Sequence, residues 1–423
     1  YMTAYFAVFI FCRGFRYIFL FFHIGFIEVD TMKKMILCCM VAVLSMTMLT
    51  SIHADEKTKQ TTKNDPQIAQ NAKSAYLMEY TSGKVIYAKN EKAKLYPASM
   101  TKMMGLLLIF ESLHDGKLDW KDEVTTSAYA ASMGGSQVFL EENETMSVKD
   151  MIKSICIASA NDAMVAMAEK VGGSAEHFVE MMNEKAKKLN LCNTHFMNPT
   201  GLHDPQHYTC AKDMAIVGKA LIKEGGDDLL KITSTYDAYI REDSEKAFWL
   251  VNTNKLLKQY PGVDGLKSGF TSQAMSCITI TAKKKDLRLI AVVMGEPSSK
   301  VRNGEIKQML DYGFSQYQQG LLYAAGTKMK TIPIENGKPQ KVDVLTDKDL
   351  VYVFEKGSEP KETAKEISLR KTHAPFKKGE IIGKVQIKMS DGYTMETALK
   401  AAHDVAALDY TDLFMKALKD VFA

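Results

Sequence analysis

"YPASMTKMMGLLLIF", residues 96–110, places a serine and a lysine three positions apart at the start of a long apolar run. The run predicts a buried helix over Met100–Leu113. Residues three apart on a helix share a face, so Ser99 and Lys102 are expected side by side. A serine hydroxyl becomes a nucleophile when a base takes its proton, and a buried lysine can be that base when it is neutral. The stretch predicts a Ser–Lys pair; the plainer alternative is a surface serine and a surface lysine near a core helix.

A second motif is "IASANDA", residues 157–163, which holds Ser159 and Asn161 between two apolar segments. In an extended loop, side chains two apart point the same way. The hydroxyl and the amide can then relay a proton and hold a substrate carbonyl at one spot. The alternative is that Ser159 or Asn161 merely caps a helix that begins at Asp162.

A third motif is "GVDGLKSGFT", residues 262–271, which holds Lys267, Ser268 and Gly269 before a strand-like run. A glycine on an edge strand lets another backbone approach closely, so a peptide substrate can pair there as an added strand. The ammonium of Lys267 and the hydroxyl of Ser268 suit a carboxylate. The alternative is a turn with a solvated lysine.

The segments around these motifs predict an α+β domain. A hairpin is expected in "SAYLMEYTSGKVIYAKN", residues 74–90, and its strands can share one antiparallel sheet with two later strands, Ser276–Ala282 and Arg288–Met294. Helices are expected between and after these strands, over Val148–Ile157, Asp162–Val171, Ser174–Leu189, Ala211–Ile222 and Arg302–Tyr317.

The two ends of the chain differ from its middle. Residues 1–54 are a leader, in which a short basic start, an apolar stretch and a small residue before Asp55 predict a signal peptide over residues 32–54. Residues 1–31 are interpreted as lying upstream of the true start, against the alternative of a membrane hairpin. A polar linker follows over residues 55–70, and the catalytic domain is expected over residues 71–325.

Short alternating runs predict a small all-β domain over residues 326–398, followed by a C-terminal segment over residues 399–423. Its helix, Tyr410–Phe422, has one apolar stripe. That helix is too short to span a bilayer. It either lies in the membrane interface or packs on its own protein, and the sequence leaves both open.

The composition excludes few functions, but it does not favour nucleic acid as a partner. The 423 residues are 46% apolar and 25% charged, with a formal net charge of +4 and no basic block. Cys156 and Cys277 lie in apolar runs and are expected to be buried free thiols. Cys192 and Cys210 could pair in an oxidising compartment, although the sequence does not require it.

The three motifs together are more specific than any one of them. S-x-x-K, S-x-N and K-S/T-G, in this order, form the signature of penicillin-binding proteins and serine β-lactamases. From Ala72 to about residue 398 the chain resembles low-molecular-weight penicillin-binding proteins of the D-alanyl-D-alanine carboxypeptidase family, of the peptidase S11 type. "GGSQVFL", "NPTGL", "FWLVNTN" and "YPGVDG" resemble its sporulation-type branch. The resemblance implies a transpeptidase-like domain with an antiparallel sheet and a helical cluster, a small β domain and a C-terminal amphipathic membrane anchor.

The resemblance also implies roles for the motif residues. It makes Ser99 the acylated nucleophile and Lys102 its general base, while the S-x-N pair shuttles a proton and orients the substrate. The strand motif faces the substrate carboxylate, helped by an arginine whose alignment is looser, and two backbone N–H groups form the oxyanion hole. These further positions are Ser159 and Asn161 for the pair, Lys267, Ser268 and Gly269 for the strand, Arg302 for the arginine, and Ser99 and Phe270 for the oxyanion hole.

Two departures from the pattern keep every functional group. Ala160 stands inside the pair where β-lactamases usually have aspartate, and Ser268 replaces the commoner threonine. The implied function is a serine-type D-Ala-D-Ala carboxypeptidase, exported to the outer face of the membrane or the wall space. It removes the terminal D-Ala of peptidoglycan stem pentapeptides in cell-wall maturation. β-Lactams are its expected covalent inhibitors, and no cofactor or metal is expected.

Three alternatives are weaker. A class A β-lactamase adds a deacylating glutamate in a Glu-x-x-x-Asn run, and no glutamate between Asn161 and Lys267 has asparagine four residues later. A metalloenzyme would use His195, His203 and His207, whose spacing matches no recognised metal site. A non-catalytic peptidoglycan-binding relative is disfavoured because every reactive side chain is present.

Overall fold

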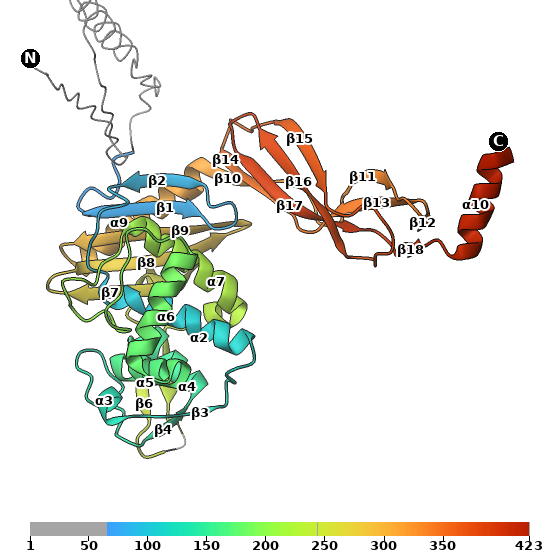
Figure 1. Cartoon of the computed structure of the whole chain (residues 1–423). Helices are drawn as coiled ribbons and strands as arrows, with labels where there is room; N and C mark the ends of the chain where they lie inside the picture. Colours follow the sequence, from blue (N-terminus) through green and yellow to red (C-terminus); the bar gives the residue numbers. More distant parts are fainter. Residues whose placement is uncertain (1–65, 243, 423) are drawn as a thin grey trace, which may run out of the picture. The chain divides into compact units, whose positions relative to one another are not determined.

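The computed structural model describes residues 66–242 and 244–422 (Figure 1). The predicted signal peptide and most of the predicted linker lie outside these residues. Among the described residues, no helix combines the length and apolar character needed to cross a membrane.

The first domain is built on one antiparallel five-stranded sheet. Its strand order is β2-β1-β9-β8-β7, so the hairpin at the start of the domain pairs with strands more than 200 residues later, as predicted. The third motif lies on β7, an edge strand, which leaves one side of this strand free to pair. The strands are β1 (Ser74–Glu79), β2 (Val85–Lys89), β7 (Val263–Thr271), β8 (Met275–Lys284) and β9 (Leu287–Glu296).

Both faces of this sheet are covered, which explains the unbroken apolar run of its central strand. Along β9, Leu289, Ala291 and Val293 join a core with α9 (Ser299–Gln316). The residues between them, Ile290 and Val292 among others, join the larger core formed with the helices of the opposite face. Because neighbouring side chains on a strand point to opposite faces, a strand with two covered faces is apolar at every position.

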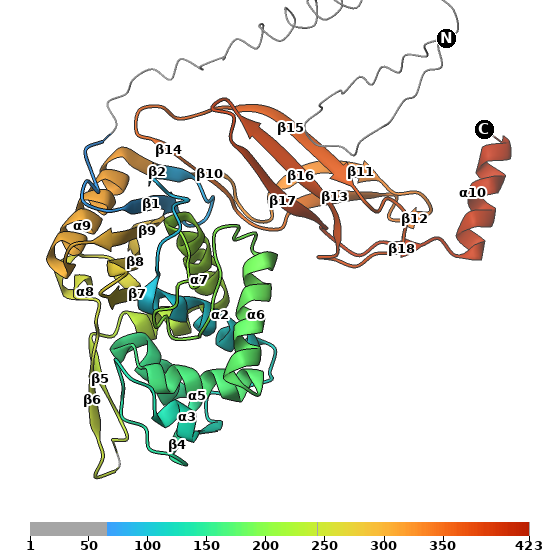
Figure 2. The same ribbon diagram turned by 60° about the vertical axis from the view of Figure 1, so that its left-hand side comes forward.

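The helical cluster on the second face surrounds α2 (Lys102–His114), whose first nine residues are all buried (Figure 2). A helix that is apolar on all sides is expected at the centre of a domain rather than at its surface. The surrounding helices are α4 (Val148–Lys153), α5 (Asn161–Gly172), α6 (Ala175–Lys188) and α7 (Ala211–Thr233), with the short α3 (Ala128–Ala131) and α8 (Leu256–Gln259). Two small hairpins complete the domain, β3 (Glu123–Thr125) with β4 (Thr145–Ser147) and β5 (Asp237–Ile240) with β6 (Phe248–Val251).

Three predicted helices differ in detail. The first is preceded by a 3-10 turn, Ala98–Thr101, so Ser99 lies just before α2 rather than inside it. The second, predicted over Val148–Ile157, divides into α4 and a π-helical turn, Ser154–Ala158. The fifth, predicted over Ala211–Ile222, continues to Thr233 across non-helical backbone at Gly226, a break that periodicity alone does not reveal.

The C-terminal region is all-β, in agreement with its alternating sequence. Strand β10 pairs with β14, and five strands form a sheet in the order β11-β13-β17-β16-β15 around their own apolar core. The strands are β10 (Tyr317–Tyr323), β11 (Lys328–Pro333), β12 (Gly337–Lys338), β13 (Lys341–Thr346), β14 (Leu350–Glu355), β15 (Glu362–Leu369), β16 (Ile381–Met389), β17 (Thr394–Ala401) and β18 (Ala406–Ala407). The helix α10 (Tyr410–Phe422) follows, and the division of the chain at residue 326 stays a prediction.

Candidate active site

The turn that carries Ser99 is packed against two glycines. A Cβ on Gly269 of β7 would lie 2.7 Å from the carbonyl oxygen of Pro97 and 3.0 Å from the backbone nitrogen of Ser99. A Cβ on Gly201 would overlap the carbonyl of Ala98, at 1.9 Å. Both positions therefore need glycine because other backbone approaches them closely. The arrangement holds the backbone N–H of Ser99 beside the edge strand.

Lys102 is fully buried at the start of α2 and has three hydrogen-bond partners. Its Nζ lies 2.9 Å from Ser99 Oγ, 2.6 Å from Asn161 Oδ1 and 2.9 Å from the carbonyl oxygen of Thr200. Burial lowers the pKa of Lys102 well below its usual value, and the positive charge of Lys267 lowers it further. Asp162 opposes this shift.

The three partners decide how the hydrogen bonds of a neutral Lys102 are arranged. A neutral amine has two N–H donors and one lone pair. The oxygens of Asn161 and Thr200 can only accept, so they take the two donors, and the lone pair faces Ser99. When Lys102 is neutral, the Ser99 hydroxyl can donate to this lone pair, whereas the charged ammonium donates to Ser99 Oγ. Ser99 and Lys102 lie side by side as expected, and their roles as nucleophile and base stay predictions.

Ser159 and Asn161 do lie at the site, but the expected extended loop is absent. Ser159 ends the π-helical turn with left-handed backbone, φ 65°, and Asn161 is the first residue of α5. Two consequences follow from this sharp turn: Asn161 faces Lys102, and Ser159 Oγ accepts a hydrogen bond of 2.8 Å from Lys267 Nζ. The N-cap of α5 is Ala160, without a side-chain hydrogen bond, so the capping alternative is wrong.

Lys267 is buried on β7, with an exposed fraction of 2%. It donates to Ser159 Oγ and, at 3.1 Å, to the carbonyl oxygen of Ser268. Burial lowers the pKa of Lys267 to about 8, opposed by Cys156 and aided by the positive charge of Arg302. Lys267 thus keeps its charge through most of the neutral range.

The hydroxyl of Ser268 lies beside a second hydroxyl. Its Oγ donates to Thr253 Oγ1 at 2.8 Å, and the Thr253 N–H donates to the carbonyl of Ile157 at 3.2 Å. Thr253 is thereby held between the π-helical turn and β7. The pair of hydroxyls next to a lysine ammonium forms a set of donors suited to a carboxylate.

The remaining two predicted residues are less directly connected to this cluster. Arg302 is buried at the start of α9, where its guanidinium donates to the carbonyl of Cys277 at 3.3 Å and to Asn303 Oδ1 at 2.9 and 3.1 Å. Burial lowers its pKa to about 10. Phe270 follows Gly269 on β7, and its ring is 68% exposed. Their roles at the site stay predictions.

Several positioning contacts were not singled out by the sequence reasoning. The carbonyl of Gly134 accepts from Asn161 Nδ2 at 2.6 Å, and the carboxylate of Asp162 accepts from the N–H groups of Val138 and Leu140 at 3.0 and 3.1 Å. Gly134, Val138 and Leu140 fall within "GGSQVFL", Thr200 within "NPTGL" and Thr253 within "FWLVNTN", whereas Asp162 directly follows the S-x-N pair. Those stretches were the available signal, although the sequence did not say which atoms they contribute.

The loop that holds His195, His203 and His207 makes structural contacts with the turn that carries Ser99. His207 Nδ1 accepts from the N–H of Met197 at 3.2 Å, so the proton is on Nε2, which lies 2.8 Å from Thr101 Oγ1 and donates to it. Burial lowers the pKa of His207 to about 4, so the ring is neutral near pH 7. His203 packs edge-on against the ring of Tyr96. This loop therefore packs on the turn that carries Ser99.

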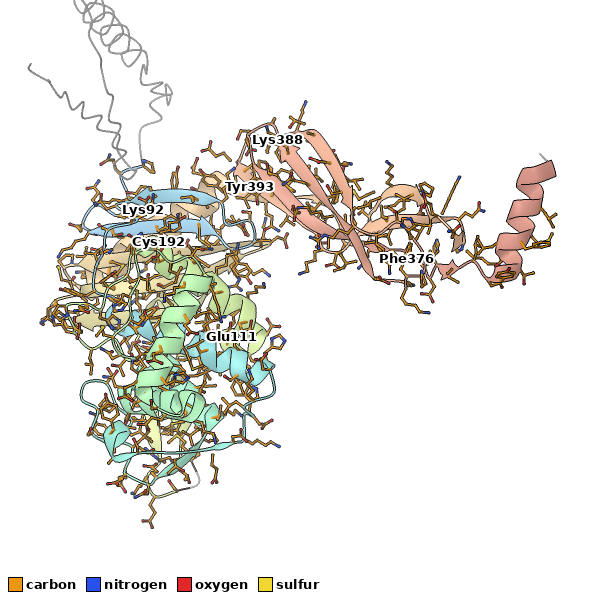
Figure 3. The ribbon with its side chains drawn as sticks, viewed as in Figure 1. Lys92, Glu111, Cys192, Phe376, Lys388 and Tyr393 are labelled. Atoms are coloured by element: carbon orange, nitrogen blue, oxygen red, sulfur yellow. The ribbon has the colours of Figure 1, made fainter. Side chains whose placement is uncertain are left out.

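The four described cysteines are free thiols. Cys156 and Cys277 are buried, as predicted. Cys192, labelled in Figure 3, is exposed and Cys210 is buried, and the two do not pair with each other.

Comparison with known proteins gives two matching family models. Residues 58–298 match the family model D-alanyl-D-alanine carboxypeptidase, and residues 317–407 match the model penicillin-binding protein 5, C-terminal domain. The chain is 43% identical over 390 residues to D-alanyl-D-alanine carboxypeptidase DacF of Bacillus subtilis, covering 92% of this chain and 99% of DacF. It is 35% identical to DacA of Haemophilus influenzae, over 80% of this chain and 86% of DacA. The crystal structure of penicillin binding protein 5 from Haemophilus influenzae superposes with a TM-score of 0.66 at 34% identity, covering 81% of this chain and 98% of that one.

Proposed function

The chain belongs to the D-alanyl-D-alanine carboxypeptidase family, and on that premise we propose that it removes the terminal D-Ala of peptidoglycan stem pentapeptides through an acyl-enzyme on Ser99. The observation that carries the proposal is the orientation of Lys102. In the neutral amine, Asn161 and Thr200 take the two N–H donors, which leaves the lone pair for the Ser99 hydroxyl. The pair is therefore arranged for proton transfer before any substrate arrives.

Acylation proceeds in two proton transfers. Ser99 Oγ attacks the carbonyl carbon of the penultimate D-Ala while its proton moves to Lys102 Nζ. The resulting oxyanion is held by the backbone N–H groups of Ser99 and Phe270. The C–N bond then breaks, and the proton on Lys102 passes through Ser159 to the amine of the leaving D-Ala.

Deacylation restores the enzyme. Water loses a proton to Lys102 and attacks the ester carbonyl, the C–O bond to Ser99 breaks, and Ser99 regains its proton. In the described part of the chain, the hydrogen-bond partners of Lys102 include no carboxylate. This supports slow release of a penicilloyl group and disfavours an efficient β-lactamase.

Recognition of the substrate is assigned to the edge strand. The backbone of β7 pairs with the extended peptide, and the terminal carboxylate is held by Lys267 and the hydroxyl of Ser268, with Arg302 adding positive charge from below. β-Lactams, which present a carboxylate next to a strained amide, occupy the same position and acylate Ser99.

The test is the release of D-Ala from diacetyl-Lys-D-Ala-D-Ala, together with covalent labelling by a fluorescent penicillin. A Ser99→Ala variant is expected to lose both signals and to keep its melting temperature. D-Ala release at the normal rate by this variant would remove Ser99 from the mechanism.

Export and membrane contact are further parts of the proposal. The leader supports export to the wall space, and α10 supports contact with the outer face of the membrane, since Tyr410 and Phe414 are 89% and 60% exposed. Sedimentation with lipid vesicles, with and without residues 400–423, tests the anchor. Equal sedimentation of the two forms would assign α10 another role.

A further inference from the structure

A cavity of about 680 Å³ lies in the first domain, and none of the candidate catalytic residues lines it. Its apolar lining includes Trp120, Ile157, Ile232 and Ala238. These residues come from the segment before β3, the π-helical turn, the end of α7 and β5, so the hollow is formed by tertiary packing. Its volume is in the range of cavities that hold small ligands.

The charges around this cavity are predominantly positive. Lys121, Lys149, Lys153 and Lys231 line it, against Asp228 as the one lining carboxylate. Lys153 forms a 2.9 Å ion pair with Asp150, outside the lining. In the described part of the chain, the ammonium groups of the other three lysines form no ion pair.

Such a combination favours an anionic ligand. A hollow with charges of one sign and a wall of low dielectric focuses the electric field and raises the local concentration of counter-ions. The side chains are lysines rather than arginines. Lysine ammonium groups bind phosphate as point charges, and several of them can approach the oxygens of one phosphate group.

We propose that this cavity binds a phosphate-bearing polyol or sugar unit of an anionic wall polymer. Trp120 and the aliphatic side chains contact the carbon skeleton of the unit, and Lys121, Lys149 and Lys231 surround its phosphate. A flat anionic lipid surface fits less well, because these exposed lysines line a hollow together with apolar side chains. The functional consequence rests on the proposed function: a wall polymer held here raises the effective concentration of nearby stem peptides at Ser99.

The cavity is also adjacent to the catalytic cluster. Ile157 lines it, and the carbonyl of Ile157 accepts from the N–H of Thr253, the residue that binds Ser268. Ser159, which binds Lys267, is two residues after Ile157. A polymer bound in the cavity therefore lies next to the turn that orients the strand side of the site.

Tryptophan fluorescence gives a direct test, because the chain has two tryptophans. Trp249 lies on β6, outside the cavity lining, and a Trp249→Phe full-length chain leaves Trp120 as the reporter. Titration with poly(glycerol phosphate) oligomers is expected to give a saturable change that weakens as salt is added. The variant Lys121→Gln/Lys149→Gln/Lys231→Gln is expected to bind at least tenfold more weakly.

A matched control removes the same charge elsewhere. Lys92→Gln/Lys188→Gln/Lys388→Gln changes three exposed lysines outside the cavity, two of which are labelled in Figure 3, and is expected to bind like the parent. The proposal is overturned if the two triple variants respond equally. It is also overturned if vesicles of phosphatidylglycerol, or a carboxylate-bearing stem peptide, change the fluorescence while the phosphate polymer does not.

The functional consequence has its own readout. The ratio of D-Ala release from polymer-bearing walls to release from diacetyl-Lys-D-Ala-D-Ala is expected to fall at least threefold in the cavity variant and to stay unchanged in the control. An unchanged ratio in the cavity variant contradicts the tethering role. Loss of release from the soluble peptide by the parent chain would instead contradict the proposed carboxypeptidase activity, whatever the fluorescence shows.

Discussion

The two sides of the catalytic cluster each hold a buried lysine, yet the two lysines are prepared for different work. On the helix side, Lys102 is surrounded by two acceptors and the Ser99 hydroxyl, and burial together with a neighbouring cation holds its pKa well below the ordinary value. On the strand side, the pKa of Lys267 is lowered only to about 8. Burial lowers both pKa values, and the neighbouring charges and acceptors distinguish the two lysines.

The largest effect is expected from the helix side. Lys102→Arg keeps a cation that cannot act as a base at neutral pH, so acylation by fluorescent penicillin should fall by about 10²–10⁴-fold. Circular dichroism melting should show a folded protein. Lys102→Met places no charge in the buried position, so it separates loss of the base from disruption by the arginine side chain. Both variants should lose acylation. Normal labelling of either variant would exclude Lys102 as the base.

The second-largest effect is expected in the pH dependence of kcat/KM, which distinguishes the two lysines. Because Lys102 acts as a neutral base and Lys267 as a cation, kcat/KM for the dipeptide substrate should decline above about pH 8, as Lys267 loses its proton. A Lys267→Arg variant keeps its charge, so this alkaline decline should disappear even if its overall rate is lower. If kcat/KM of the variant still declined with the same midpoint pH as the parent, the titration would belong to another group.

A smaller effect is expected at the second hydroxyl of the strand side. Thr253→Val removes the partner of Ser268 while nearly preserving volume, and one lost hydrogen bond of about 0.5–1.5 kcal/mol corresponds to a rise in KM of about 2–13-fold. The rate constant for acylation should change less, because Thr253 does not contact Ser99 or Lys102. Thr253→Ser is the matched control and should retain the parental KM; a fall in kcat without a change in KM would place Thr253 on the helix side of the comparison.

The smallest effect concerns the loop that supports the helix side. His207 has a pKa of about 4 in the folded protein and is neutral there near pH 7. In the unfolded chain its pKa returns to the ordinary value of about 6.5. The unfolded chain therefore binds a proton first as pH falls from about 6.5 to 4, and stability is lost over that window, by up to about 3 kcal/mol. His207→Gln should melt with a weaker dependence on pH between 7 and 5. An unchanged dependence would assign the acid sensitivity to other groups.

The sequence predicted which residues cluster at the candidate site better than it predicted their geometry. The hairpin, the central helix and the covered sheet followed from apolar patterning, because both faces of β9 and all sides of α2 are buried. The π-helical turn and the left-handed Ser159 did not follow, since periodicity carries no information about one extra residue in a turn. Thr200 and Thr253 were missed for a related reason: a backbone carbonyl or a lone hydroxyl acquires its role only from what lies beside it.

By itself, the sequence determined the family, the order of the three motifs and the apolar run that buries Lys102. Only the tertiary structure decided that Asn161 faces Lys102 while Ser159 faces Lys267, and that Gly269 brings the edge strand against the turn of Ser99. The physical reason is that pKa values and proton-transfer directions depend on burial and on neighbours within a few ångströms. In this chain those neighbours lie 59 to 108 residues away in sequence, and folding alone brings them together.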